Sequence, residues 1–147
     1  MQLTKYSDYG LRVLMYVSLK TDGLSTIREI SEAYNISENH LMKLIHHLGK
    51  LGYIHTVRGK NGGIELARNP DSINIGDLIL ETETNLNIVE CFDPQQNTCP
   101  IMGYCRLEII LSEALEAFIQ ILKKYTLQDL IERPNNLTRK LLKINQS

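Results

Sequence analysis

The chain has 147 residues, of which 43% are hydrophobic, and its formal net charge at pH 7 is -1. This apolar content and balanced charge exclude an intrinsically disordered chain, and the length suits one globular domain or a small module with an appended element. The N-terminal residues lack the charged-then-apolar layout of a signal peptide, and no apolar run approaches the roughly 18 residues that span a bilayer. We therefore expect a cytoplasmic protein.

The charge is unevenly distributed along the chain. Before Pro70 there are nine Lys and Arg residues against six Asp and Glu, and from Pro70 onwards there are seven against eleven. The segment from Ser37 to Arg68 holds five of the basic residues, only two acidic ones and all four histidines. The neutral average therefore hides a mildly basic N-terminal half and an acidic C-terminal half, and the basic half could meet nucleic acid.

Helical spacing of apolar residues predicts three helices in the first half of the chain, over about 8–19, 27–34 and 38–51. The candidate N-caps are Ser7 for the first helix, Ser25 or Thr26 for the second and Ser37 for the third. The second and third helices are joined by only three or four residues. Two short helices joined in this way are typical of a helix-turn-helix.

After Gly52 the apolar period changes from that of a helix to that of a strand. Residues 53–57 and 64–66 are predicted strands, and the glycine-rich segment 59–63 contains the Asn-Gly signal of a hairpin turn. A three-helix unit followed directly by a hairpin predicts a winged helix-turn-helix, which is a mainly α fold with a small β-hairpin. In that fold the third helix enters the major groove, and the hairpin tip reaches the backbone or the minor groove.

Polar side chains lie where a winged helix would meet DNA. They are Asn39, His40 and Lys43 on the third helix, and Arg58, Lys60 and Asn61 at the hairpin tip. On an isolated helix such residues are often only a solvated face, but a glycine-rich basic tip after a helix-turn-helix has few structural reasons to exist. The tip lacks the spacing of a phosphate-binding loop and does not precede a helix. We therefore predict binding to double-stranded DNA, and we expect His46, His47 and His55 on the helix surface or the hairpin rather than as ligands.

The second half of the chain combines a short helix, an irregular segment and a long helix. They are expected from Asp77 to about Glu83, over 85–104 and from Arg106 to Tyr125. The long helix is apolar around more than one stripe, so a single small winged helix cannot bury it, and we expect a homodimer. We divide the chain into a DNA-binding region (1–70), a connecting helix and cysteine loop (71–105), a dimerisation helix region (106–132) and a polar tail (133–147).

All three cysteines, Cys91, Cys99 and Cys105, lie in or at the end of the irregular segment. The close Cys-x-x-Cys pairs that are typical of structural zinc sites are absent. Wider spacings in a wrapped loop suit an iron-sulfur cluster, in which the thiolates reach separate corners of a larger object. The spacing alone leaves a cluster, a zinc ion and a thiol switch open, and it favours the cluster. Three thiolates would leave one iron in need of another ligand.

The chain resembles the iron-sulfur winged-helix regulators over nearly its whole length, through residues 1–12, 39–43, 57–64 and 125–130. The resemblance implies a homodimer in which the three cysteines bind a cluster. In the nitric-oxide-sensing members a carboxylate, matching Asp8 here, completes the coordination from the partner subunit. The cluster-biogenesis members instead use a histidine three residues after the third cysteine. This chain has Glu108 there, which argues against that subtype and makes Glu108 a second candidate oxygen ligand.

The resemblance therefore implies a transcriptional repressor that senses nitric oxide through an iron-sulfur cluster, 4Fe-4S rather than 2Fe-2S, and whose operator is released when the cluster is nitrosylated or lost. A carboxylate is a weaker partner for iron than a thiolate, so the iron that Asp8 holds would be the most open to nitric oxide. Arg12, one helical turn after Asp8, could hold that carboxylate by an ion pair. The alternative is a regulator of the same family that responds to iron or cluster supply. No substrate-binding motif and no nucleophile-base arrangement is present, so we do not expect an enzyme.

Overall fold

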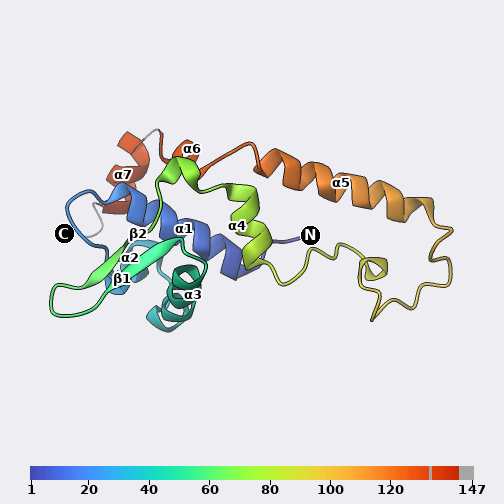
Figure 1. The fold of residues 1–147 in the computed structure, drawn as a ribbon, viewed down its shortest axis with the longest axis horizontal. Helices are drawn as coiled ribbons and strands as arrows, with labels where there is room; N and C mark the ends of the chain where they lie inside the picture. The colour runs from blue at the N-terminus through green and yellow to red at the C-terminus, as the bar shows by residue number, and fades with distance from the viewer. Residues whose placement is uncertain (133, 143–147) are drawn as a thin grey trace.

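The structure, a computed structural model, describes residues 1–132 and 134–142. The hairpin and all described helices except one long helix lie together in a part that we call the head. The long helix and an irregular loop before it project from the head to one side (Figure 1). The elements in chain order are α1 (Lys5–Leu19), α2 (Ile27–Tyr34), α3 (Glu38–Lys50), β1 (Ile54–Val57), β2 (Gly63–Leu66), α4 (Ile75–Thr82), α5 (Arg106–Leu122), α6 (Leu127–Ile131) and α7 (Pro134–Leu142), with short 3-10 turns at Pro70–Ser72 and Glu90–Phe92. No helix in the described part of the chain is long and apolar enough to cross a membrane.

The predicted helix-turn-helix is confirmed, and local capping defines it. Thr26 caps α2 in a capping box with Glu29, and Asn35 ends that helix in the left-handed conformation with φ 54°. Ser37 then caps α3 by accepting a hydrogen bond from the His40 backbone N–H. The turn between the two helices is therefore specified by residues that lie next to it in the sequence.

The first helix begins earlier than predicted, because its cap is Thr4 rather than Ser7. The Thr4 side chain accepts a hydrogen bond from the Ser7 backbone N–H, so Ser7 already lies inside α1. The Ser7 side chain is fully buried and hydrogen-bonded to Thr82 of α4, with 2.8 Å between the two hydroxyl oxygens. A serine that is a good cap by local rules is used here for a tertiary contact.

The core lies where α1, α3 and α4 face one another. Val13 and Leu14 of α1, Leu41 and Leu48 of α3 and Leu78 of α4 have no exposed surface. Burying one such side chain contributes about 1.5–3 kcal/mol. The core therefore holds α3 firmly against α1. We call α3 the recognition helix, because it is the helix predicted to enter the major groove of DNA.

The predicted hairpin is also confirmed. Strands β1 and β2 pair antiparallel, with Ile54 opposite Leu66 and Val57 opposite Gly63, and we call residues 54–66 the wing. The wing is fixed to the head by two backbone hydrogen bonds between Ser25 and Ile64. Gly63 allows this approach, because a Cβ there would lie 2.7 Å from the Ser25 carbonyl oxygen. The wing therefore keeps a fixed position beside the helix-turn-helix.

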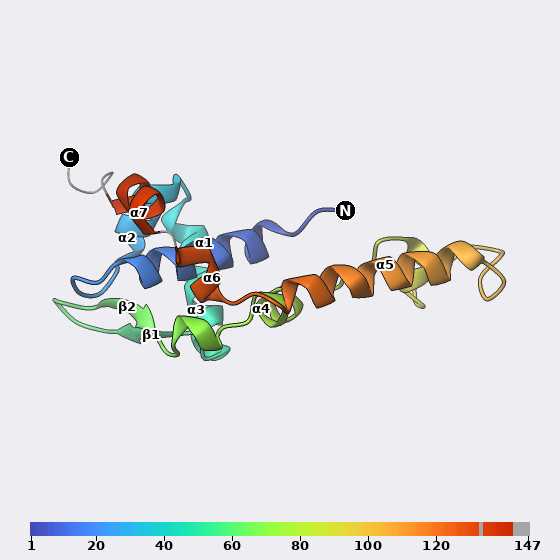
Figure 2. The same ribbon diagram turned by 90° about the horizontal axis from the view of Figure 1, so that it is seen from above.

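The second half follows the predicted order, with shifted boundaries. Helix α4 begins at Ile75, because Asn74 caps it by accepting from the Asp77 backbone N–H. Helix α5 ends at Leu122, and only Ile119 of its 17 residues is buried. Seen from above, α5 extends well beyond the head (Figure 2). The short helix α6, which the sequence did not predict, returns the chain to the core through the buried Leu127.

The expectation of a polar tail is wrong for residues 134–142, which form the helix α7. Leu141 is buried, and Leu137 and Leu142 pack against the core. Leu137 and Leu141 are four residues apart, so they share one face of the helix, whereas Arg139 and Lys140 between them are exposed. The rest of the expected tail, residues 133 and 143–147, lies outside the described residues.

The close packing of α4 on the end of α5 can be tested at Gly76. A Cβ at this position would come within 2.9 Å of the Lys123 backbone nitrogen and 3.1 Å of its Cα. We expect Gly76→Ala to push the two helices apart and to lower the free energy of unfolding by about 1–3 kcal/mol, measured by urea denaturation. The matched change Gly49→Ala, inside α3, meets nothing closer than 3.9 Å and should instead stabilise by up to about 1 kcal/mol. Equal effects of the two changes would contradict this account of the packing.

Candidate functional site

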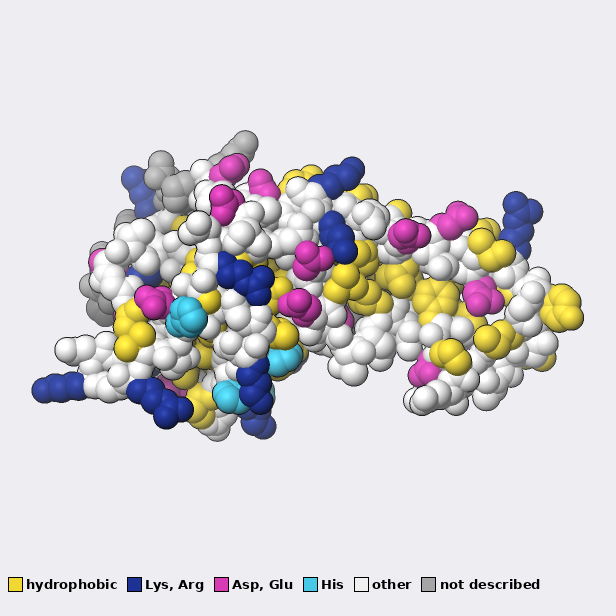
Figure 3. All heavy atoms as spheres, in the orientation of Figure 1, with side chains coloured by type: hydrophobic (Ala, Val, Ile, Leu, Met, Phe, Trp, Pro, Cys, Tyr) yellow, Lys and Arg dark blue, Asp and Glu magenta, His cyan; other side chains and the backbone are white. Residues whose placement is uncertain are grey.

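The residues predicted to contact DNA are all exposed, at the start of α3 and at the tip of the wing. They are Asn39, His40, Lys43, Arg58, Lys60 and Asn61. Figure 3 shows Lys, Arg and His side chains gathered over the wing and α3, whereas the acidic side chains lie mainly above them and along the projecting part. On this face, basic side chains of the N-terminal half therefore lie together over the wing and α3.

The sequence analysis missed Lys5, which extends this basic surface. Lys5 and Tyr9 of α1 line a hollow of about 220 Å³ together with His40 and Lys43 of α3. Lys5 is exposed, so its ammonium group adds positive charge beside the first turn of the recognition helix. Its role depends on the packing of α1 against α3, and no local pattern in the sequence indicates it.

The three cysteines lie in one irregular loop, residues 84–105, which we call the cysteine loop. Cys91, Cys99 and Cys105 are free thiols and partly buried. Burial raises the pKa of the Cys91 thiol, and so do the carboxylate of Glu108 and, to a smaller extent, the other two cysteines. Cys91 therefore lies within electrostatic range of the other thiols and of Glu108.

The chemistry of this donor set fits iron, because three thiols are held in one loop and none is used in a disulfide. The described residues contain no group of three or more His, Cys, Asp or Glu side chains already arranged around one point. A cluster would therefore have to gather the three thiolates, and a single described chain does not surround it.

Asp8 lies in the head, in the first turn of α1, and its carboxylate is held by Arg12. The Arg12 Nε donates to one carboxylate oxygen of Asp8 at 3.1 Å, and Nη2 donates to the other at 2.8 Å. This confirms the predicted ion pair. The guanidinium also lies 5.6 Å from the centre of the Tyr9 ring and 5.9 Å from that of Tyr34. The Asp8 carboxylate is therefore oriented on a half-exposed surface of α1.

The structure does not bring Asp8 together with the cysteines of its own chain. Helix α1 lies within the head, whereas the cysteine loop runs out along α5 in both views (Figures 1 and 2). Glu108, the second candidate oxygen ligand, is the one whose charge raises the pKa of Cys91. The two candidate oxygen ligands therefore differ in the subunit that would supply them. Glu108 could approach the thiols of its own subunit, whereas Asp8 would have to reach the cysteines of a second subunit.

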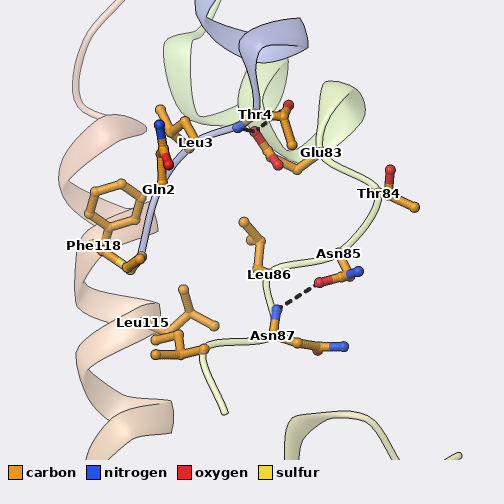
Figure 4. Close-up of a pocket in the computed structure, with 12 residues that line it drawn as sticks. Gln2, Leu3, Thr4, Glu83, Thr84, Asn85, Leu86, Asn87, Leu115 and Phe118 are labelled. Atoms are coloured by element: carbon orange, nitrogen blue, oxygen red, sulfur yellow. Dashed lines mark hydrogen bonds between the residues drawn. The ribbon is translucent and has the colours of Figure 1, made fainter. Parts of the chain in front are cut away.

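Hydrogen bonds join the start of the cysteine loop to the turn of α1 that carries Asp8. The Glu83 carboxylate accepts from the Thr4 backbone N–H at 2.8 Å and from the Thr4 hydroxyl at 3.0 Å. Figure 4 shows this contact at the edge of a cavity of about 670 Å³, walled by the N-terminal segment, residues 83–88 and Leu115 and Phe118 of α5. Sequence reasoning missed Glu83, because its partner is 79 residues away.

The helix-turn-helix, the fixed wing and the exposed basic surface define a winged-helix DNA-binding protein. Comparison with known proteins agrees. Residues 3–133 match the Rrf2 family model, which is described as an iron-dependent transcriptional regulator. The chain is 49% identical over 147 residues to the HTH-type transcriptional regulator NsrR of Bacillus subtilis, an alignment that covers 99% of this chain and 100% of that protein.

Two solved structures share the fold. One is T. potens IscR, with a TM-score of 0.73 and 23% identity over 93% of this chain and 90% of that one. The other is CymR, the global cysteine regulator of B. subtilis, with a TM-score of 0.69 and 25% identity over 92% and 99%. The chain belongs to the Rrf2 family of transcriptional regulators. The mainly α winged-helix fold and the family resemblance predicted from the sequence are both confirmed.

The basic wing tip allows a test by salt dependence. Lys60 is exposed there, so Lys60→Ala should weaken binding to every DNA sequence. It should also reduce the slope of log affinity against log salt concentration by about one, because one phosphate contact is lost. The slope is measured by fluorescence anisotropy on a mixed-sequence duplex. Lys124→Ala, which removes an exposed lysine after α5, is the control and should leave the slope unchanged. If Lys60→Ala also leaves it unchanged, the wing tip does not contact phosphate.

Proposed function

We propose that the protein is a homodimeric repressor that senses nitric oxide through a 4Fe-4S cluster, in the reducing cytoplasm. The ligands are Cys91, Cys99 and Cys105 of one subunit and Asp8 of the other. The observation that carries the proposal is the placement of all three cysteines of the chain, as free thiols, in one loop. The resemblance to nitric-oxide-sensing regulators, seen in the same residues, supplies the signal.

A second copy of the chain is the proposed cover for α5. Four of its large apolar side chains have more than half of their surface exposed: Leu107 at 58%, Ile109 at 60%, Ile110 at 52% and Ile121 at 54%. Soluble monomers rarely leave so many apolar side chains together in water. Pairing α5 with its own copy covers both helices with one set of residues, as a two-fold interface does.

The proposed dimer also explains why Asp8 and the cysteines lie apart in one chain. A cluster bound in the cysteine loop of one subunit would receive Asp8 from the partner subunit. When bound, it supplies irons that react with nitric oxide. Arg12 keeps the Asp8 carboxylate oriented until the ligand is needed, and Glu83 keeps the first turn of α1 next to the start of the loop.

Release of Asp8 would then change the fit to DNA. Without the coordination of the cluster by the partner's Asp8, the two subunits would be less firmly joined. The two α3 helices would then no longer keep the separation of successive major grooves, about 34–36 Å. Glu108 as the ligand would tie nothing across the interface, because it belongs to the subunit that supplies the thiols. For this reason we assign Asp8 rather than Glu108.

A regulator that responds to iron or cluster supply is the second candidate. The family's description as iron-dependent favours it. It uses the same cysteines and the same DNA-binding surface, but nitric oxide plays no part. Comparing protein with and without cluster on DNA, in the presence and absence of nitric oxide, separates the two candidates.

The ligand assignment makes a prediction for protein purified without oxygen. The wild type should be coloured, contain iron and sulfide, and release DNA of its own upstream region when nitric oxide is added. Cys99→Ala should remove the absorbance, because three thiolates are the strong ligands. Asp8→Ala should keep the cluster but make it lose iron faster. The measurements are visible absorption, iron release to a chelator and a gel shift.

Asp22→Ala and Glu108→Ala are the controls, since each removes one carboxylate. The first removes an exposed one between α1 and α2, and the second removes the competing candidate ligand. Both should leave the rate of iron release near that of the wild type. Fast release from Glu108→Ala combined with normal release from Asp8→Ala would reverse the assignment. Colourless protein that contains only zinc would remove the sensor and leave DNA binding intact.

A further inference from the structure

Tyr53 is the point where the recognition helix, the wing and α4 are joined. Its backbone N–H donates to the Leu48 carbonyl of α3 at 3.0 Å, and its own carbonyl accepts from the Ala67 N–H, just after β2, at 2.9 Å. Its ring is buried, with 2% of its surface exposed. Its hydroxyl reaches out of the core and donates to the Glu81 carboxylate of α4 at 2.5 Å. One side chain thus connects the DNA-reading elements to α4.

Arg68 strengthens this junction from the other side of the ring. Its guanidinium lies 4.2 Å from the centre of the Tyr53 ring. The same guanidinium donates to the carbonyls of Leu51 and Gly52, at 2.7 and 2.8 Å, where α3 ends. Arg68 lies two residues after the end of β2, so the end of the wing, the end of α3 and the Tyr53 ring are held as one unit. We call Tyr53, Arg68 and Glu81 the α4 clamp.

Helix α4 is in turn fixed to the end of α5. The Asn74 side chain donates to the Lys123 carbonyl at 2.7 Å, and the Lys123 ammonium lies 3.2 Å from the Asp77 carboxylate. The backbone N–H of Ile75 donates to the Tyr125 carbonyl at 3.0 Å. Figure 1 shows α4 between the head and α5. The hydroxyl of Tyr53 is therefore a link in a continuous chain of contacts from α3 to α5.

We propose that the α4 clamp sets the orientation of the recognition helix relative to α5, so that Tyr53 and Glu81 determine which spacing between two DNA half-sites the dimer accepts. The inference rests on the proposed function in needing two DNA-reading heads joined through α5. Tyr53 and Glu81 are positioning residues, which contact no base and no phosphate in this account. They act on spacing, whereas Asn39 and Lys43 act on each half-site.

The contacts of the clamp explain why such control would depend on a single hydrogen bond. The core fixes α3 against α1, but Glu81 lies on an exposed position of α4 and reaches the α3–wing junction only through the Tyr53 hydroxyl. A hydrogen bond to a charged group is stronger than one between neutral groups. Without it α4 would still be held against α1 by the buried Leu78 and by Thr82, but the end of α3 and the wing could shift slightly against its exposed face. The fold would survive such a shift, whereas the separation of the two α3 helices would not stay fixed.

The test uses the full-length protein and a duplex that the wild type selects from a randomised library. A second duplex carries one extra base pair at the centre, which moves one half-site by about 3.4 Å. The measured quantity is the ratio of the affinity for the selected duplex to the affinity for the duplex with the extra base pair. Tyr53→Phe keeps the buried ring and its contact with Arg68, and it removes only the hydroxyl. We expect it to lower the ratio about tenfold, roughly the effect of losing one hydrogen bond to a charged group.

Matched variants separate positioning from a general loss of stability. Glu81→Ala removes the acceptor from an exposed position and should lower the ratio as Tyr53→Phe does. Glu81→Gln keeps an acceptor oxygen and should keep most of the wild-type ratio. Glu132→Ala removes an exposed carboxylate that follows α6, away from the clamp, and should change nothing. The salt dependence of binding should be the same for all four, because no phosphate contact is altered.

A wild-type ratio in both Tyr53→Phe and Glu81→Ala would overturn the inference and leave the proposed function standing. An equal loss of affinity for both duplexes would also overturn it, since the clamp would then act within one half-site. A wild type that selects no DNA at all, or only a single half-site, would contradict both the inference and the proposed dimeric repressor.

Discussion

The structure depends on one hydrophobic constraint, the uncovered surface of α5. The head buries its own core through α1, α3 and α4, whereas α5 projects from it with only Ile119 buried. Water disfavours such a helix, and this is the physical reason for proposing that a second copy of the chain covers it. Once α5 is paired, the two heads and the two cysteine loops acquire fixed positions. In the proposed dimer, the predicted DNA-binding surface and the proposed sensor would therefore be coupled through the same interface.

Helix α4 is the element at which these parts meet. It is hydrogen-bonded to the end of α5 through Asn74, to the α3–wing junction through Glu81 and to α1 through Thr82, and Glu83 directly after it bonds to Thr4. The cysteine loop begins immediately beyond these last contacts. A change in the loop would therefore act on α1 and α4 before it reaches the recognition helix. Short helices with contacts on several sides are well suited to such a role, because they move as units.

Local signals made much of the fold predictable from the sequence. Thr26 and Ser37 cap their helices as expected, and the glycine-rich segment 59–63 turns the chain between the two strands of the wing, where the Gly62 backbone N–H donates to the Gly59 carbonyl. Each of these features is set by neighbouring residues. Long-range contacts were not predictable. Ser7 fits the pattern of an N-cap and instead bonds to Thr82, 75 residues away. The clustering of the cysteines and the exposure of the residues predicted to bind DNA followed from the sequence, whereas Glu83, Tyr53 and Glu81 contact partners that no periodicity indicates.

The most direct test of the account is whether Asp8 acts across the subunit interface. Chains carrying Asp8→Ala and chains carrying Cys99→Ala would be given different tags, co-expressed, and purified without oxygen as the mixed dimer. Such a dimer keeps one site with three cysteines and the partner's intact carboxylate. The account predicts half the iron and absorbance of the wild type, with iron released at the wild-type rate. Release as fast as from an Asp8→Ala homodimer that loses iron faster than the wild type would place Asp8 on the cluster of its own subunit and would contradict the account. An Asp8→Ala homodimer that releases iron at the wild-type rate would also contradict it, because Asp8 would then not be a ligand.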